Sequence, residues 1–217
     1  MRLIEKENTY LIENFFSSSL AGFTKPSLKG QDVEKDMRES LSFLKEFKVS
    51  FLNQRHSSQI NFIEEEGIYE GDGLFTRKEK LVLVIKTADC LPVLFEDEKE
   101  KIIGALHLGW RSLKEGILEN INFPLSSFKV FVGVGLRKCC YRVGKEFLSY
   151  SYLKDFVLRK RDGFYFDVIA FLKNSLFKKG LKEENFFDLN FCSLCKNFLS
   201  YRRTRTIFRT LTFVMKK

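Results

Sequence analysis

Three short apolar runs that lie close together in the chain constrain its fold more than any other feature. They cover residues 81–85, 92–95 and 102–106 and are rich in β-branched residues. Runs of four to eight apolar residues are typical of buried strands and are shorter than most helices. The acidic residues 96–100 separate the second run from the third and predict a solvated turn. We therefore expect neighbouring strands here.

Polar side chains lie immediately beyond the C-terminal ends of two of these runs. Residues 87–90, Thr-Ala-Asp-Cys, come after the first run, and residues 107–111, His-Leu-Gly-Trp-Arg, come after the third. Strand ends place such residues at the edge of a sheet. The sequence therefore predicts that the Cys90 thiol and the His107 imidazole meet at one rim.

The rest of the chain predicts further strands and helices around this centre. Strands are expected at residues 10–16, 51–56, 59–63, 128–132 and 186–191. A loop is expected at 22–30 and a turn at 74–76, with Asp72 just before it. Four helices are expected. The first follows Asp32 and has Met37, Leu41, Leu44 and Phe47 on its apolar side, and the second starts just after Arg111, where Ser112 and Glu115 have capping-box spacing. The other two cover residues 144–152 and the segment from Asp167 to Gly180.

Composition predicts one globular domain over residues 1–217. Hydrophobic residues make up 44% and charged residues 30%, and no linker rich in Pro, Gly or Ser divides the chain. No apolar run reaches the roughly 20 residues of a membrane span, and the N-terminus lacks a secretory segment. We expect a cytoplasmic protein without a membrane partner. The odd number of cysteines, five, favours thiols that bind metal or act as nucleophiles.

The net charge of +9 raises the question of nucleic acid. Residues 201–209 do mix basic and aromatic side chains, but the lysines are spread along the chain and no nucleic-acid-binding motif is present. We expect no nucleic-acid partner. A basic surface also attracts small anions such as phosphate.

His56, Cys90 and His107 form a candidate metal-binding set. The chain contains only two histidines, and each follows an expected strand and precedes turn residues. Catalytic zinc commonly has three such ligands and keeps a fourth position for water. The alternative from residue types alone is two structural histidines and a buried thiol.

The other four cysteines lie in two pairs. Cys192 and Cys195 have CxxC spacing, which suits half of a zinc ribbon or a redox pair, and Cys139 and Cys140 are candidates for the other half. Adjacent cysteines suit tetrahedral chelation poorly, so packing is the favoured interpretation. Residues 133–135, Gly-Val-Gly, are too short for a dinucleotide-binding motif.

Five segments together resemble the family of multicopper polyphenol oxidases, or laccase-domain proteins, whose members are regarded as purine nucleoside phosphorylases with adenosine deaminase activity. They are residues 54–56 (Gln-Arg-His), 87–93 (Thr-Ala-Asp-Cys-Leu-Pro-Val), 107–111 (His-Leu-Gly-Trp-Arg), 139–144 (Cys-Cys-Tyr-Arg-Val-Gly) and 200–203 (Ser-Tyr-Arg-Arg). The resemblance implies an α+β fold, a layered α/β/β/α sandwich with mixed sheets. It also implies zinc at His56, Cys90 and His107, a site that can take Cu²⁺ in vitro. Two histidines cannot furnish a multicopper centre.

The resemblance also implies substrates and roles. Phosphate and a purine nucleoside, such as adenosine, inosine or S-methyl-5'-thioadenosine, would yield free base and ribose 1-phosphate. The candidate phosphate-binding residues are Arg111, Lys25 and Arg209. Family members usually carry an arginine shortly after the position of Gly22-Phe23, and Lys25 is the candidate to replace it in this chain. For deamination, Asp72 or Asp89 would carry the proton.

Two alternatives from other classes stay open. One is a cysteine hydrolase or amidase in which Cys90 is the nucleophile and His107 the base. The other is a non-enzymatic protein that binds zinc or copper or senses redox state through its thiols and imidazoles.

Overall fold

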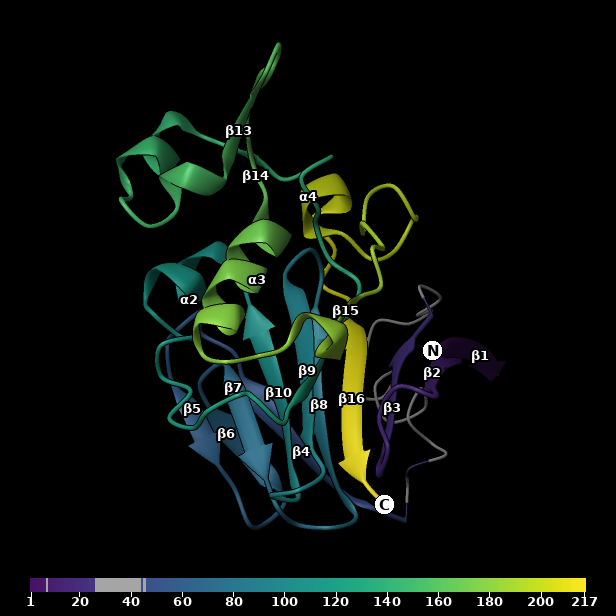
Figure 1. The fold of residues 1–217 in the computed structure, drawn as a ribbon. Helices are drawn as coiled ribbons and strands as arrows, with labels where there is room; N and C mark the ends of the chain where they lie inside the picture. The colour runs from purple at the N-terminus through teal and green to yellow at the C-terminus, as the bar shows by residue number, and fades with distance from the viewer. Residues whose placement is uncertain (7, 26–43, 45) are drawn as a thin grey trace.

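Two large sheets dominate a computed structural model of the protein, which describes residues 1–6, 8–25, 44 and 46–217 (Figure 1). The first sheet has seven strands in the order β1 (Arg2–Lys6), β2 (Thr9–Glu13), β3 (Ser19–Thr24), β16 (Thr210–Lys216), β8 (Leu81–Thr87), β4 (Lys48–Asn53) and β6 (Gly67–Glu70). The second has six, in the order β15 (Phe186–Asp188), β11 (Lys129–Val132), β9 (Leu91–Asp97), β10 (Ile102–Leu108), β7 (Gly73–Thr76) and β5 (Ile60–Phe62). Each sheet contains parallel and antiparallel pairs.

The two sheets pack face to face. Side chains alternate along β8, so that Leu81, Leu83 and Ile85 point to the core between the sheets, while Val82 and Val84 belong to a cluster on the opposite face. Both faces of β8 are thus buried, which explains its continuous apolar sequence. Each fully buried Leu, Ile or Val contributes roughly 1.5–3 kcal/mol of hydrophobic stabilisation.

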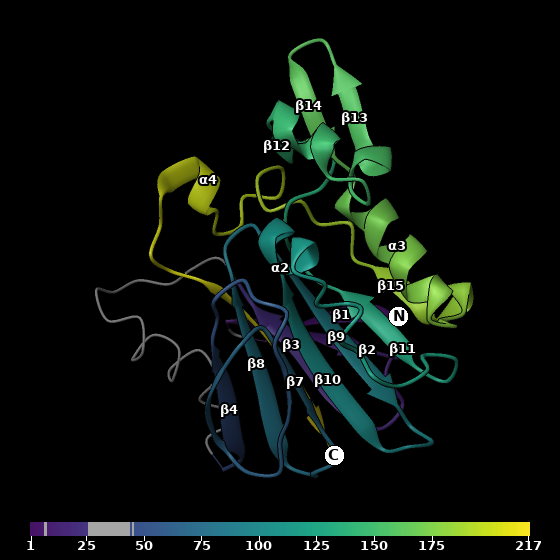
Figure 2. The same ribbon diagram turned by 90° about the vertical axis from the view of Figure 1, so that its left-hand side faces the viewer.

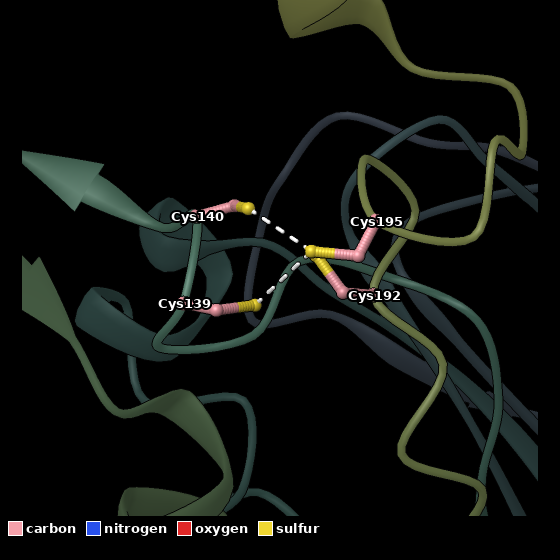
Figure 3. A group of neighbouring side chains, drawn as sticks. All are labelled: Cys139, Cys140, Cys192 and Cys195. Atoms are coloured by element: carbon pink, nitrogen blue, oxygen red, sulfur yellow. Dashed lines mark hydrogen bonds between the residues drawn. The ribbon is translucent and has the colours of Figure 1, made fainter.

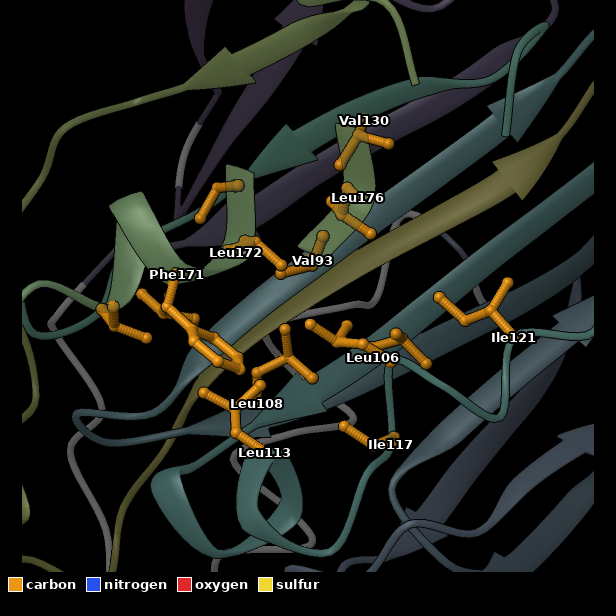
Figure 4. Close-up of a cluster of buried hydrophobic side chains, with 14 of the residues drawn as sticks. Val93, Leu106, Leu108, Leu113, Ile117, Ile121, Val130, Phe171, Leu172 and Leu176 are labelled. Atoms are coloured by element: carbon orange, nitrogen blue, oxygen red, sulfur yellow. The ribbon is translucent and has the colours of Figure 1, made fainter. Parts of the chain in front are cut away.

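Helices cover the outer face of the six-stranded sheet (Figure 2). They are α2 (Trp110–Lys114) and α3 (Val168–Lys178), and Phe171, Leu172 and Leu176 of α3 lie in one cluster with Val93 and Val130 of the sheet (Figure 4). The carboxylate of Asp167 accepts a hydrogen bond from Ala170 N at 3.1 Å and caps α3, as the sequence predicted.

A small three-stranded sheet projects beyond this layer (Figure 1). Its strands are β12 (Arg142–Val143), β14 (Gly163–Phe166) and β13 (Val157–Lys160). Short helices in the described residues also include η2 (Lys145–Ser149), η3 (Lys154–Phe156), η4 (Glu183–Asn185) and α4 (Tyr201–Thr204). None of the helices in the described part of the chain combines the length and apolar character that a bilayer crossing demands.

The expected fold class is confirmed: an α+β protein built mainly of mixed sheets. The strands expected at 81–85, 92–95 and 102–106 correspond to β8, β9 and β10, and residues 98–100 form the turn between the last two. The helix expected after Asp32 lies outside the described residues, apart from positions 44 and 47 at its expected end.

Several local expectations are wrong. Residues 74–76 are not a turn but part of β7, which pairs with β10 on one side and β5 on the other. Gly22 lies in β3 rather than in a loop. Its lack of a side chain allows the close approach of the neighbouring strand, since a Cβ there would lie only 2.5 Å from the carbonyl oxygen of Tyr10. The helix expected over 144–152 is only the short 3₁₀ helix η2. The C-terminal strand β16, which the sequence analysis did not identify, lies inside the seven-stranded sheet.

Candidate metal centre and substrate cavity

His107 is held by a buried carboxylate. It lies in β10, and its Nδ1 is 2.7 Å from Oδ1 of Asp72, which directly precedes β7. Both side chains are almost inaccessible to solvent. Since Nδ1 faces Asp72, Nε2 on the other side of the ring is free to face Cys90, whose charge acts on His107. A carboxylate on the far nitrogen orients a histidine for metal binding.

The same carboxylate also shapes the loop that carries His56. Asp72 accepts hydrogen bonds from the backbone N–H groups of Arg55, His56 and Ser57 at 3.2, 3.0 and 2.6 Å. The Ser57 hydroxyl donates to it as well, at 2.8 Å. This network holds His56 at a φ of 59°, a left-handed conformation that few non-glycine residues adopt. One buried carboxylate therefore places both histidines.

Cys90 lies where the chain passes from one large sheet to the other. It follows β8 of the seven-stranded sheet and precedes β9 of the six-stranded sheet. Its Sγ is 3.6 Å from Nε2 of His56. Gly109 permits this approach, because a Cβ there would lie 2.7 Å from Cδ2 of His56 and 3.1 Å from Sγ of Cys90. The rim shared by the two sheets thus brings the thiol and both imidazoles together.

The buried thiol and imidazole shift each other's ionisation. Burial opposes the thiolate of Cys90, but the charge of His107 and the hydrogen-bonding of both imidazoles together outweigh it and lower the pKa of Cys90 to about 6. Burial likewise opposes the imidazolium of His107, yet the Cys90 thiolate and the Asp72 carboxylate raise its pKa to about 9. Without a metal, these groups form an ion pair.

The donor set fits a single divalent metal ion. One ligand atom from each of His56, Cys90 and His107 can be chosen so that all three lie within 4.8 Å of one another. Two imidazoles and one thiolate suit zinc, and three protein ligands leave a position open in a tetrahedral site.

A cavity of about 750 Å³ opens beside these residues. Cations dominate the charge of its wall. Among the described residues the wall carries Lys86, Arg111, Arg202, Arg205 and Arg209 against one carboxylate, Asp89. Burial lowers the pKa of Lys86, and the charge of Arg209 lowers it further. An excess of positive charge in a cavity favours an anionic ligand.

Aromatic rings complete the wall. Trp110, Tyr141 and Tyr201 line the cavity together with Leu136 and Ile207. Tyr141 is buried, and burial raises the pKa of its hydroxyl, which keeps it neutral. Flat apolar faces beside polar groups suit the binding of a heterocyclic base.

The structure brings together most, not all, of the residues expected at the site. Arg111, Arg209 and Asp89 line the cavity with the three candidate metal ligands. Asp72 lies behind His107 and is not among the lining residues. Lys25 does not line the cavity either. Its ammonium group pairs with the Glu5 carboxylate and lies over the Tyr10 ring.

The helix expected to start just after Arg111 begins two residues earlier, at Trp110. Gly109 is its N-cap, and Ser112 is the third helical residue, whose hydroxyl accepts a hydrogen bond from Gly109 N at 3.0 Å. Helix α2 has only five residues, so its dipole contributes little to binding an anion.

Sequence analysis missed Lys86, Tyr141, Tyr201, Arg202 and Arg205 as cavity residues. Tyr141, Tyr201 and Arg202 lie within the segments that carry the family resemblance, so a usable signal was present. The backbone N–H of Arg202 also donates a hydrogen bond to the Asp89 carboxylate at 2.7 Å. Lys86 is the next-to-last residue of β8 and follows five apolar residues of that strand. Nothing in the local sequence indicates that it lines the cavity.

Fold and site define a class of protein in which two mixed sheets deliver a His/Cys/His set to the mouth of a cationic cavity. A family model described as multi-copper polyphenol oxidoreductase laccase matches residues 27–217, and the chain belongs to this family. A purine nucleoside phosphorylase of Borreliella burgdorferi is 35% identical over 175 residues, 73% of this chain and 75% of the relative. Another, of Clostridium acetobutylicum, is 30% identical over 191 residues, 78% of this chain and 77% of the relative.

A solved structure shows the same fold. The crystal structure of YlmD from Geobacillus stearothermophilus superposes with a TM-score of 0.85 at 21% identity, covering 99% of this chain and 98% of that one. With only two histidines in the whole chain, the copper in the family's description does not fit a multicopper centre.

Proposed function

We propose that this protein is a zinc-dependent purine nucleoside phosphorylase that also deaminates adenosine. The observation that carries the proposal is the convergence of His56, Cys90 and His107 on the wall of a cavity rich in cations and aromatic rings. The names of the two relatives support the phosphorylase part. A zinc ion held by the three side chains would supply Lewis-acid polarisation beside the substrate.

Phosphorolysis requires the chain to hold an anion beside a nucleoside. Arg111 and Arg209 line the same cavity, and guanidinium groups bind phosphate through paired hydrogen bonds. A phosphate oxygen would attack C1' of the ribose while the glycosidic C–N bond breaks and its electron pair passes to the purine. The products are the free base and ribose 1-phosphate.

The aromatic residues would hold the base. Trp110, Tyr141 and Tyr201 offer ring faces for stacking, and the neutral Tyr141 hydroxyl is available to hydrogen-bond to a purine edge. Filling the cavity would exclude water from the ribose, which favours attack by phosphate.

Deamination would use water in place of phosphate. Water adds to C6 of adenosine, ammonia leaves, and inosine remains, so a side chain must move a proton. Asp89 is the carboxylate that faces the cavity, and its oxygens are fixed by Ser193 Oγ at 2.8 Å and Arg202 N at 2.7 Å. We assign proton transfer to Asp89 and a positioning role to Asp72, which is buried behind His107.

Product analysis tests the proposal. The protein is incubated with adenosine, inosine or S-methyl-5'-thioadenosine, with and without phosphate, and the products are separated. Free base is expected only with phosphate, and inosine from adenosine without it. If none of the nucleosides is converted by zinc-loaded protein, the proposal is wrong.

The ion pair of Cys90 and His107 supports a second candidate, a cysteine hydrolase. A thiolate beside an imidazolium is the arrangement of an activated nucleophile. That candidate predicts acyl transfer by metal-free protein and its loss after alkylation by iodoacetamide. The nucleoside enzyme predicts no such activity.

A further inference from the structure

Four cysteine side chains form a second cluster outside the cavity. Cys139 and Cys140 face Cys192 and Cys195 across two neighbouring loops (Figure 3). The sequence analysis favoured packing as their role, and the structure contradicts this for Cys139 and Cys195, which are exposed. Exposed thiols that converge on one point need another explanation.

Sheet topology explains why these loops meet. Strands β11 and β15 are parallel neighbours, with Val132 opposite Asp188, so the loops that follow them leave the same end of the sheet. Gly135 joins the loops: its N–H donates to Phe191 O at 3.2 Å, and Ser193 N–H donates to Gly135 O at 3.0 Å. The approach of the cysteines thus rests on regular backbone pairing.

The sulfur positions match a tetrahedral metal site. The Sγ atom of Cys195 lies 3.7 Å from that of Cys139 and 3.5 Å from that of Cys140, and all four Sγ atoms lie within 4.8 Å of one another. Zinc–sulfur bonds of about 2.3 Å place the corners of a tetrahedron about 3.8 Å apart. Disulfide sulfurs lie about 2.05 Å apart, and all four cysteines are free.

The CxxC turn is held by its own backbone. Lys196 N–H donates to Cys192 O at 2.9 Å, and Phe198 N–H donates to Ser193 O at 2.9 Å. These hydrogen bonds fix the loop that carries Cys192 and Cys195, and such support is what metal ligands receive from their surroundings.

Cations surround the cluster. Lys160 Nζ donates to Lys138 O at 2.9 Å and contacts Cys139 O at 3.5 Å, while Arg202 Nη1 donates to Cys140 O at 3.3 Å. Four thiolates around one divalent ion carry a net charge of −2. Nearby ammonium and guanidinium groups offset such a charge.

We propose that Cys139, Cys140, Cys192 and Cys195 bind one structural Zn²⁺ ion in a closed tetrathiolate site. Thiolates select zinc, copper(I) or iron–sulfur clusters, and four protein ligands leave no open position for a substrate. An iron–sulfur cluster distributes its thiolates over two or more irons, whereas four thiolates that all lie within 4.8 Å of one another suit a single ion. The site goes beyond the proposed function and does not depend on it.

The ion would fix two parts of the cavity wall. Tyr141 follows Cys140 directly, and Ser193, inside the CxxC turn, donates its hydroxyl to Asp89 at 2.8 Å. The ion would therefore act as a crosslink between the loops and leave the catalytic chemistry to the first site.

Metal analysis of three proteins tests the proposal. Wild type, Cys195→Ser and Cys90→Ala are purified as full chains and their zinc is measured. We expect two ions per chain in the wild type and one in each variant. After exchange into Co²⁺, the strong thiolate-to-cobalt absorption of four sulfurs is expected in Cys90→Ala and absent in Cys195→Ser. Equal metal content in Cys195→Ser and the wild type would overturn the proposal.

Alkylation of the wild type provides a test that needs no variant. Iodoacetamide is applied to folded protein before and after a chelator, and the modified cysteines are mapped by mass spectrometry. Bound zinc is expected to slow modification of Cys139 and Cys195 by about tenfold or more, since a ligand at ten times its Kd protects to that degree. Equal rates at these two exposed thiols in zinc-loaded and chelated protein contradict the proposal. Protection of Cys90 is scored separately and reports on the first site.

Discussion

The His56/Cys90/His107 set and the four-cysteine cluster are two candidate metal sites built in opposite ways. The first has three ligands, lies at the wall of a cavity, and depends on a buried carboxylate, Asp72, for its geometry. The second has four ligands, lies outside the cavity, and depends on paired backbone between two loops. Its cysteines at 139 and 195 are exposed.

Ligand number and access separate a reactive site from a structural one. Three ligands beside a cavity leave room for substrate, whereas four thiolates complete the coordination of zinc. The surroundings agree with this division, because the first site opens on a cavity lined by cationic and aromatic side chains that suit a nucleoside and phosphate.

The largest effect is expected from Cys90→Ala. Loss of the central thiolate should remove zinc from the first site and lower phosphorolysis by at least about 10³-fold, equivalent to about 4 kcal/mol of activation energy. Rates with inosine and zinc content are measured on the same preparation. Cys195→Ser is the matched control, because it removes a thiol from the other site and should keep measurable turnover. Full activity in Cys90→Ala would exclude the proposed centre.

Asp72→Asn should weaken the first site without removing a ligand. Loss of the charge behind His107 is expected to reduce metal affinity about 10–100-fold. The amide also leaves buried N–H groups of the His56 loop without an acceptor, at a cost of about 1–3 kcal/mol. Chelator competition gives the affinity and thermal unfolding gives the stability.

Glu70→Gln is the control for this variant. Glu70 pairs with Arg55 at 3.0 Å in the same region but is exposed. Its loss should change stability little, since exposed ion pairs contribute about 0–1 kcal/mol. If both variants keep wild-type metal affinity, Asp72 does not position His107 for metal binding.

Arg111→Ala should raise the phosphate concentration needed for half-maximal phosphorolysis by about ten- to a hundredfold, the loss of one charge-assisted interaction of roughly 1.5–3 kcal/mol. Deamination should change less, because water needs no anion-binding group. Among the described residues Arg111 has no ion-pair partner, and its guanidinium lies 5.4 Å from the Trp110 ring centroid. A structural role would instead lower Tm and both activities together.

Arg159→Ala is the matched control for charge. Arg159 is exposed in β13 and does not line the cavity. An equal rise in phosphate requirement in both variants would indicate a general effect of surface charge and remove Arg111 from the site.

The smallest effect concerns pH and the metal-free protein. Because the folded-state pKa of Cys90 is lowered to about 6, its thiolate should persist down to that pH, whereas an ordinary thiol is protonated below about 8.5. The rate of Cys90 alkylation against pH should have its midpoint near 6. His107→Gln should move the midpoint toward the ordinary range, and zinc should suppress the reaction at every pH. A midpoint near 8.5 in the parent protein would contradict the ion pair.

Local sequence determined the strands around the site, because their apolar runs and the acidic turn between them need no distant partner to be recognised. It also determined the cap of α3 at Asp167, a contact over three residues. The two histidines and Cys90 stood out because of their rarity and their place after apolar runs. The single-domain organisation over 1–217 stays a prediction.

Tertiary structure alone decided which side chains share a site. Asp72 was one of two candidates for proton transfer, with Asp89, and the pairing of β7 with β10 buries it against His107, 35 residues away. Strand β16 lies inside a sheet because β3 and β8, both distant in sequence, pair with it. The four cysteines meet because β11 and β15 are parallel neighbours, so that Cys139 and Cys195 approach across 56 residues. The spacing of residues along the chain does not predict such pairings, because they depend on which strands lie side by side in the fold.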